Sequence, residues 1–131
     1  MESWRTVYRN GFAPILPTAG LEYAAEILRN DDKRLLQGAT TKPPGMACVE
    51  DWPCEGGCFL AMCGLGNGLE TVGEVQAFFA QACFDADQLL KESAACRYFL
   101  NWADDTPRDE MRRELLMEVE RTLAERKRGA A

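Results

Sequence analysis

The chain has 131 residues, of which 47% are hydrophobic and 27% charged, and its formal net charge at neutral pH is −6. This composition is typical of a globular domain and excludes a disordered or fibrous chain. The chain contains no histidine, which argues against hydrolases of the triad kind because they need an imidazole base.

The negative charge is concentrated in the middle of the chain. Residues 43–105 hold ten acidic and two basic residues, a local net charge of −8, whereas residues 1–42 and 106–131 are each near +1. Proteins bind nucleic acids largely by neutralising phosphates with Lys and Arg. We therefore expect no nucleic-acid partner.

The start of the chain lacks the basic residues and the apolar stretch of a secretory signal. No apolar run approaches the roughly 20 residues that cross a bilayer. We therefore expect a cytoplasmic protein with reduced cysteines and no membrane contact.

An N-terminal arm is expected over residues 1–20. Residues 3–10 have apolar side chains at helical spacing and end in Asn10-Gly11, a common helix stop, although the same residues fit an edge strand. Pro14 and Pro17 oppose helix in the segment that follows because each proline pushes its predecessor into an extended conformation.

A second helix is expected to start after Thr18 and to end before Asn30. A short helical turn is predicted over Lys33–Gln37. Residues 38–50 have no periodicity, so we expect a long loop, which Pro43-Pro44-Gly45 makes semi-rigid.

The most apolar stretch is expected to form a central buried helical hairpin. Asp51-Trp52-Pro53 is a typical helix start, and it predicts a first helix over residues 54–64. A glycine-rich turn follows. Thr71 and Glu74 then match the capping box of a second helix over residues 72–90.

Two further helices complete the predicted fold. Ser93 is expected to cap a helix over residues 94–103, and Thr106-Pro107 to start a last helix over residues 107–126. Residues 126–131 would then be a basic tail. The sequence therefore predicts an all-α fold, a compact single-domain bundle of about five helices over the whole chain.

Four of the six cysteines lie close together in the sequence: Cys48, Cys54, Cys58 and Cys63. Four thiolates can hold zinc or an iron–sulfur cluster. On one continuous helix Cys63 would point about 180° away from Cys54, so the thiols converge only if Gly56-Gly57 breaks the helix. We expect buried cysteines and no cofactor, and we keep a cysteine-ligated metal domain as an alternative.

Paired carboxylates leave a second alternative, a small enzyme without histidine. The pairs are Glu22 with Glu26, Asp85 with Asp87, and Asp104 with Asp105. Such an enzyme needs a deep pocket that holds two convergent acids.

The preferred functional prediction is a non-catalytic inhibitor or adaptor whose acidic middle segment binds a protein partner with a basic surface. The predicted contact residues are Glu50, Asp51, Glu55, Asp85 and Asp87, together with Thr41 and Pro44 of the long loop. A homodimer formed through exposed Trp4, Trp52 or Trp102 is a variant of the same prediction.

Overall fold

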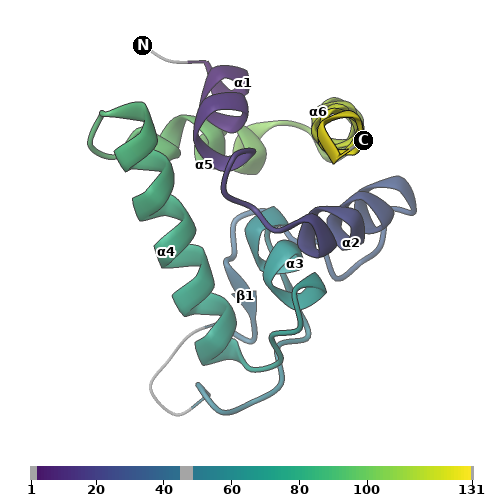
Figure 1. Cartoon of the computed structure of the whole chain (residues 1–131). Coiled ribbons are helices and arrows are strands. Elements are labelled where there is room, and N and C mark those ends of the chain that lie inside the picture. Colours follow the sequence, from purple (N-terminus) through teal and green to yellow (C-terminus); the bar gives the residue numbers. More distant parts are fainter. Residues whose placement is uncertain (1–2, 45–48, 131) are drawn as a thin grey trace.

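A computed structural model describes residues 3–44 and 49–130, and it is mostly helical, as predicted (Figure 1). One small two-stranded sheet accompanies the helices. In chain order the elements are α1 (Trp4–Val7), the π-helical turn η1 (Tyr8–Phe12), α2 (Thr18–Arg29), β1 (Thr41–Lys42), β2 (Gly56–Gly57), α3 (Phe59–Gly66), α4 (Val72–Leu90), α5 (Cys96–Asp105) and α6 (Arg108–Ala130). No helix in the described part of the chain is both long and apolar enough to span a membrane.

The N-terminal helix runs past its predicted stop at Asn10-Gly11. The side chain of Ser3 caps α1, and η1 continues without a break to Phe12. Gly11 faces α4, where a Cβ atom would lie 2.9 Å from Leu90 Cδ1 and 3.1 Å from Ala86 Cβ. The glycine therefore permits close packing between two helices and does not end one.

Residues 54–58 are extended, so the predicted helix over residues 54–64 is wrong at its start. Helix α3 begins only at Phe59, and Gly56–Gly57 pair with Thr41–Lys42 as an antiparallel β-strand. The backbone of Gly57 also bonds to Arg34 and Leu36, which replaces the predicted helical turn over Lys33–Gln37. A Cβ atom on Gly57 would clash with the carbonyl oxygen of Thr40, so only glycine permits this approach.

Helix α3 lies at the centre of the hydrophobic core. Its residues Leu60 to Cys63 are fully buried, and it packs on both α2 and α4. An aromatic cluster extends this core toward the N-terminus, with ring centroids 5.2–6.3 Å apart: Tyr8, Phe12, Phe59 and Phe99.

Helix α4 has the predicted bounds and the predicted capping box. The Thr71 hydroxyl accepts a hydrogen bond from the Glu74 amide, and the Glu74 carboxylate accepts from the Thr71 amide. Helix α5 starts at Cys96, later than predicted. The side chain of Asp87, and not that of Ser93, accepts from the amide groups at its start.

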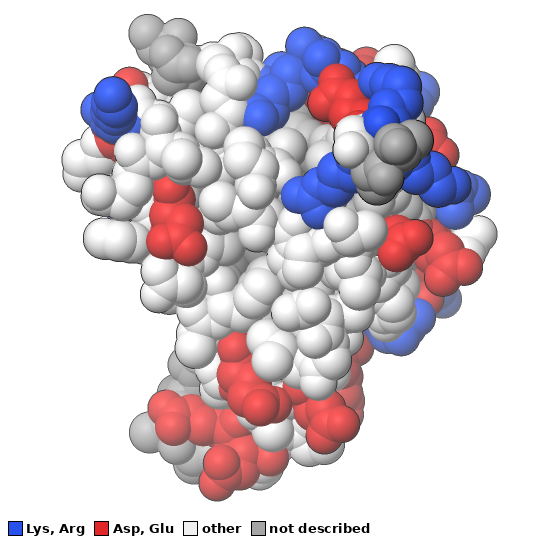
Figure 2. Space-filling view, in the orientation of Figure 1, with Lys and Arg blue, Asp and Glu red and all other residues white. Residues whose placement is uncertain are grey.

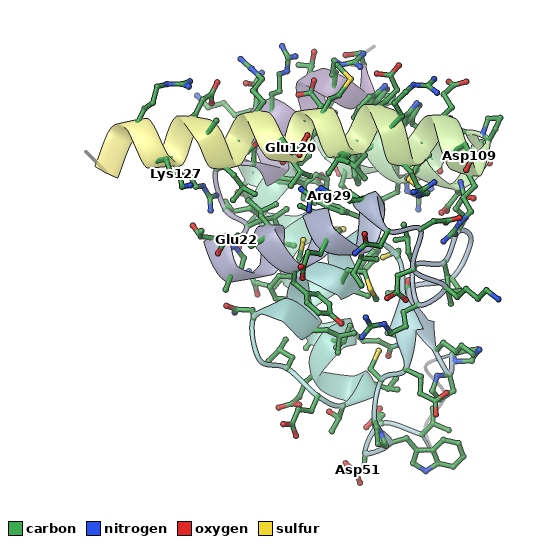
Figure 3. The ribbon with its side chains drawn as sticks, turned by 90° about the vertical axis from the view of Figure 1, so that its right-hand side faces the viewer. Glu22, Arg29, Asp51, Asp109, Glu120 and Lys127 are labelled. Carbon is green, nitrogen blue, oxygen red and sulfur yellow. The ribbon has the colours of Figure 1, made fainter. Side chains whose placement is uncertain are left out.

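Helix α6 crosses the N-terminal half of the chain and continues through the predicted tail at residues 126–131 as far as Ala130. Figures 1 and 3 show it lying across α2. Its arginines bind backbone carbonyl groups of that half of the chain. Arg108 donates to Leu35 and Asp32, Arg112 donates to Leu28 and Arg29, and Arg126 donates to Ala13.

The carboxylate of Glu118 also connects α6 to the N-terminal helix, and the Glu118 side chain is 5% exposed. It accepts hydrogen bonds from Arg9 at 2.8 and 2.9 Å and from Arg5 at 3.0 Å. The hydrogen bonds from Arg9 and Arg5 lower the pKa of Glu118 below its usual value, against the opposing effect of burial.

We expect Glu118→Ala to lower the free energy of unfolding by about 2 kcal/mol or more, because it removes three charge-assisted hydrogen bonds. The matched control is Glu120→Ala, whose half-exposed ion pair with Arg29 should be worth about 0.5 kcal/mol or less. Chemical denaturation measures both. Folding lowers the pKa of Glu118. The stabilisation that its carboxylate contributes is therefore fully present above the unfolded pKa of roughly 4.3, and it is lost as the pH falls through the pKa of the folded state. Equal losses for the two variants would contradict the assigned role.

The contact between α2 and α3 generates a second prediction. A Cβ atom on Gly20 would clash with the carbonyl oxygen of Cys63, so Gly20→Ala should lower the free energy of unfolding by about 2 kcal/mol. Gly129 in α6 has open space around it, and Gly129→Ala should leave stability unchanged or slightly raised. A wild-type unfolding midpoint for Gly20→Ala would show that the two helices do not pack this closely.

Candidate functional site

Two loops meet at the end of the molecule that lies farthest from α6. The amide of Gly73 donates to the Glu50 carbonyl, that of Val72 to Trp52, and that of Cys54 to Glu70. These backbone bonds join residues 50–54 to residues 70–73 and to the start of α4. The loops therefore form a defined surface on the rigid end of a helix.

Five acidic residues gather on this surface, which we name the acidic tip: Glu50, Asp51, Glu55, Glu70 and Glu74, all exposed. Figure 2 shows acidic side chains at the lower end of the molecule and basic side chains over α6 at the upper right. Asp51 lies at the extreme end of the tip in Figure 3.

Trp52 lies within the acidic tip and is 55% exposed. Its amide donates to Val49 and its carbonyl accepts from Val72, so its backbone is fixed on both sides. An exposed indole beside carboxylates offers apolar area and a π face to a cation. No structural role in the core explains this side chain.

The carboxylates of the acidic tip divide into two kinds. Glu74 is engaged in capping α4, and hydrogen bonds from the Thr71 and Glu70 amides lower its pKa. The other four carboxylates, those of Glu50, Asp51, Glu55 and Glu70, have no hydrogen bond or ion pair within residues 3–44 and 49–130. The amide of Glu55 donates to the carbonyl of Lys42, so one basic residue adjoins the acidic tip along the backbone.

The structure separates Asp85 and Asp87 from the other predicted contact residues. Glu74 is in the first turn of α4 and the two aspartates are in its last turns. Eleven residues along the helix separate Glu74 from Asp85, which corresponds to about 16 Å along its axis. Asp85 accepts a hydrogen bond from Gln81, and Asp87 caps α5. These two acids therefore have local structural partners and lie outside the acidic tip.

The predicted loop over residues 38–50 places only one of its two predicted contact residues on an accessible surface. Thr41 is 2% exposed, and its hydroxyl donates to the Pro43 carbonyl. Thr41 is therefore not available to a partner, which corrects its prediction as a contact residue. Pro44 is exposed at the end of the described part of the loop.

Three of the four cysteines predicted as alternative metal ligands are described in the structure, Cys54, Cys58 and Cys63, and they are not placed to hold a metal ion together. Cys48 lies outside the described residues. The thiol of Cys54 donates to the Gly56 carbonyl, and burial raises the pKa of Cys58 to about 11 and that of Cys63 above its usual value. Within residues 3–44 and 49–130, no group of three or more potential ligands is placed to hold a metal ion.

The side chain of Asp87 accepts hydrogen bonds from the amides of Ala94 and Cys96 at the start of α5. Sequence reasoning missed this role because the two amides lie beyond the end of the helix that carries Asp87. The available signal is the position of Asp87 in the last turn of α4, directly before the short connection to α5.

Helices α2 and α6 border an open groove of about 540 Å³. Figure 3 shows Glu22 and Arg29 of α2 facing Glu120 and Lys127 of α6. Glu22 and Glu26, one of the predicted carboxylate pairs, are both exposed and also border a neighbouring open groove of the same volume. Neither groove is the deep pocket that a carboxylate enzyme needs. Asp104 accepts from the Gly38 amide, and Asp105 is exposed.

The two aspartates in the C-terminal part of α4, Asp85 and Asp87, provide a direct test of which carboxylates are structural. Asp87→Ala should lower the free energy of unfolding by about 1–2 kcal/mol because two amides at the start of α5 lose their acceptor. Asp85→Ala removes one exposed hydrogen bond and should change the free energy of unfolding by about 0.5 kcal/mol or less. Thermal or urea unfolding compares them, and a larger loss for Asp85→Ala would refute the assignment.

Comparison of the chain with protein-family models, with curated proteins and with solved structures gives no match.

Proposed function

We propose that the protein is a small, non-catalytic interaction protein of the cytoplasm, an inhibitor or adaptor, that binds a basic protein surface through its acidic tip. The observation that carries this proposal is one exposed indole, Trp52, fixed among carboxylates that have no partner of their own in the described structure. A partner cation would find both a π face and acceptor oxygens there.

The scaffold beneath the tip supports this proposal. We infer a single domain of about five helices in which α3 and α4 form a central hairpin. The capping box fixes the start of α4, and backbone bonds fix the two loops to it. A fixed surface loses little conformational entropy when a partner binds.

Electrostatics favours a basic partner over an acidic one or a nucleic acid. The unpaired carboxylates lie together at one end, so their fields add at that surface. The cations of α6 are mostly engaged with carbonyl groups and carboxylates of the same chain. A homodimer through Trp52 remains a variant, because the same indole would then bind a second copy. The rings of Trp4 and Trp102 stack on each other with their centroids 3.6 Å apart. Trp52 is therefore the more accessible of the three tryptophans for a dimer contact.

A labelled nona-arginine peptide is a suitable probe for the acidic tip. We expect the triple variant Glu50→Lys, Asp51→Lys and Glu55→Lys to bind it at least about tenfold more weakly than the wild type, because each lost contact contributes up to about 1 kcal/mol. Trp52→Ala should weaken binding by about fivefold, by removing the cation–π contact, with unchanged stability. Fluorescence anisotropy at low salt measures the affinities.

The matched control is a second triple variant, Glu26→Lys, Glu92→Lys and Glu110→Lys. It changes the net charge by the same amount at exposed carboxylates away from the tip. We expect it to lose clearly less affinity than the tip variant. Equal losses in the two triple variants would show that the peptide senses only net charge, and the proposed site would be rejected.

A further inference from the structure

The outward surface of α4 carries no charge over most of its length. Between Glu74 and Lys91 the exposed residues of this helix, which is described throughout, are Ala77, Ala80, Gln81, Phe84, Gln88 and Leu89. The Phe84 side chain is one of the large apolar side chains on the surface, and it is 59% exposed. The outward surface of a helix in a globular protein normally carries charged side chains, as that of α6 does. The composition of α4 is therefore that of a helix with a contact surface on its outside.

Five of these residues form one face, which we name the outer face of α4. Steps of three and four residues separate them, which places them along one side of the helix: Ala77, Ala80, Gln81, Phe84 and Gln88. Ala77 lies seven residues before Phe84, so a small and a large side chain follow each other at a distance of two helical turns. Phe84 and Gln88 also border an open depression of about 440 Å³ at the C-terminal end of the helix.

We infer that the outer face of α4 binds the same face of a second copy of the chain, with the two helices antiparallel. A two-fold interface uses one surface twice, so a large side chain of one copy must meet a small one of the other. In an antiparallel pair, the register that places Phe84 opposite the partner's Ala77 also places Ala80 opposite the partner's Gln81. The outer face is therefore complementary to itself. This inference is independent of partner binding by the acidic tip.

The charges at the two ends of α4 favour the same direction. Glu70 precedes the helix and Lys91 follows it, and in the described part of the chain both side chains are exposed and without a hydrogen bond or ion pair. The register given above brings Lys91 of each copy near the partner's Glu70. A parallel pair would instead place like charges together at both ends, and repulsion disfavours that arrangement. Glu92 borders the depression beside Lys91, so these charges select the direction of the pair more than they add affinity.

The interface is small, because a single helix of each copy takes part. Stable interfaces bury at least roughly 1,200 Å² in total, and weaker, transient ones bury less. We therefore expect a reversible dimer with a Kd on the order of 100 μM.

Sedimentation velocity of the full-length chain under reducing conditions, from about 5 to about 500 μM, tests this inference over the range in which so weak an interface is populated. We expect monomers at the lowest concentration and dimers at the highest. Phe84→Lys should raise the Kd at least about tenfold, because the charge enters two equivalent contacts of the dimer. The matched control is Met117→Lys on α6, where a side chain that is 58% exposed undergoes the same change in charge. It should change the Kd by about twofold or less.

A charge exchange tests the direction of the pair. Glu70→Lys alone and Lys91→Glu alone should each raise the Kd by about fivefold, and the double variant should recover the wild-type Kd, because it restores both ion pairs in reverse. Trp52→Ala should leave dimerisation unchanged, which distinguishes this contact from one through the acidic tip. Circular dichroism confirms that each variant is folded.

Four results would overturn the inference. They are a wild-type chain that stays monomeric at about 500 μM, far above the expected Kd, equal effects of Phe84→Lys and Met117→Lys, a double charge variant that is no better than the single ones, and loss of the dimer in Trp52→Ala.

Discussion

The arginines of α6 hold the N-terminal half of the chain in place by donating to its backbone carbonyl groups. Arg108 and Arg112, one helical turn apart, together cover the end of α2 and the turn that follows it. The carbonyls of Leu28 and Arg29, which lie at the end of α2, have no partner within that helix. Arg126 likewise donates to the carbonyl of Ala13, between η1 and α2. Helix α6 therefore joins α2, on which it packs, to α1, whose Arg5 binds the Glu118 carboxylate.

This use of arginine also explains the charge asymmetry of the surface. Four of the α6 arginines are engaged within the chain, namely Arg108, Arg112, Arg121 and Arg126. The field of these cations is therefore partly cancelled locally, although the helix looks basic in Figure 2. Four carboxylates of the acidic tip, those of Glu50, Asp51, Glu55 and Glu70, have no such compensation in the described structure. This group of unpaired charges of one sign is the reason why we assign partner binding to that end.

The sequence predicted those elements whose signals are local. The capping box of Thr71 and Glu74 specified α4 correctly because both partners lie within one helical turn. The prediction failed at residues 54–58 because the decisive contacts are distant in the sequence. Gly57 pairs with Thr41 and also bonds to Arg34, and no local pattern reveals that only a glycine fits there. The local sequence of residues 54–58 favours a helix, but backbone hydrogen bonds to distant residues hold the segment in an extended conformation.

The same distinction applies to the candidate sites. Glu50, Asp51 and Glu55 were identified from local charge density, and the structure places them on one surface. The described cysteines that are close in the sequence are not placed to hold a metal ion, and the hydrogen bonds from the start of α5 to Asp87 have no local sequence pattern that reveals them.

Helix α4 connects the acidic tip to the start of α5, yet it should transmit little between them. Its N-terminus is closed by the capping box, and its C-terminus by Lys91 in a left-handed conformation whose amide bonds to Gln88. A helix fixed at both ends is not a two-state element, and coupling between sites requires one. Partner binding at the acidic tip should therefore leave the contact between Asp87 and the start of α5 unchanged.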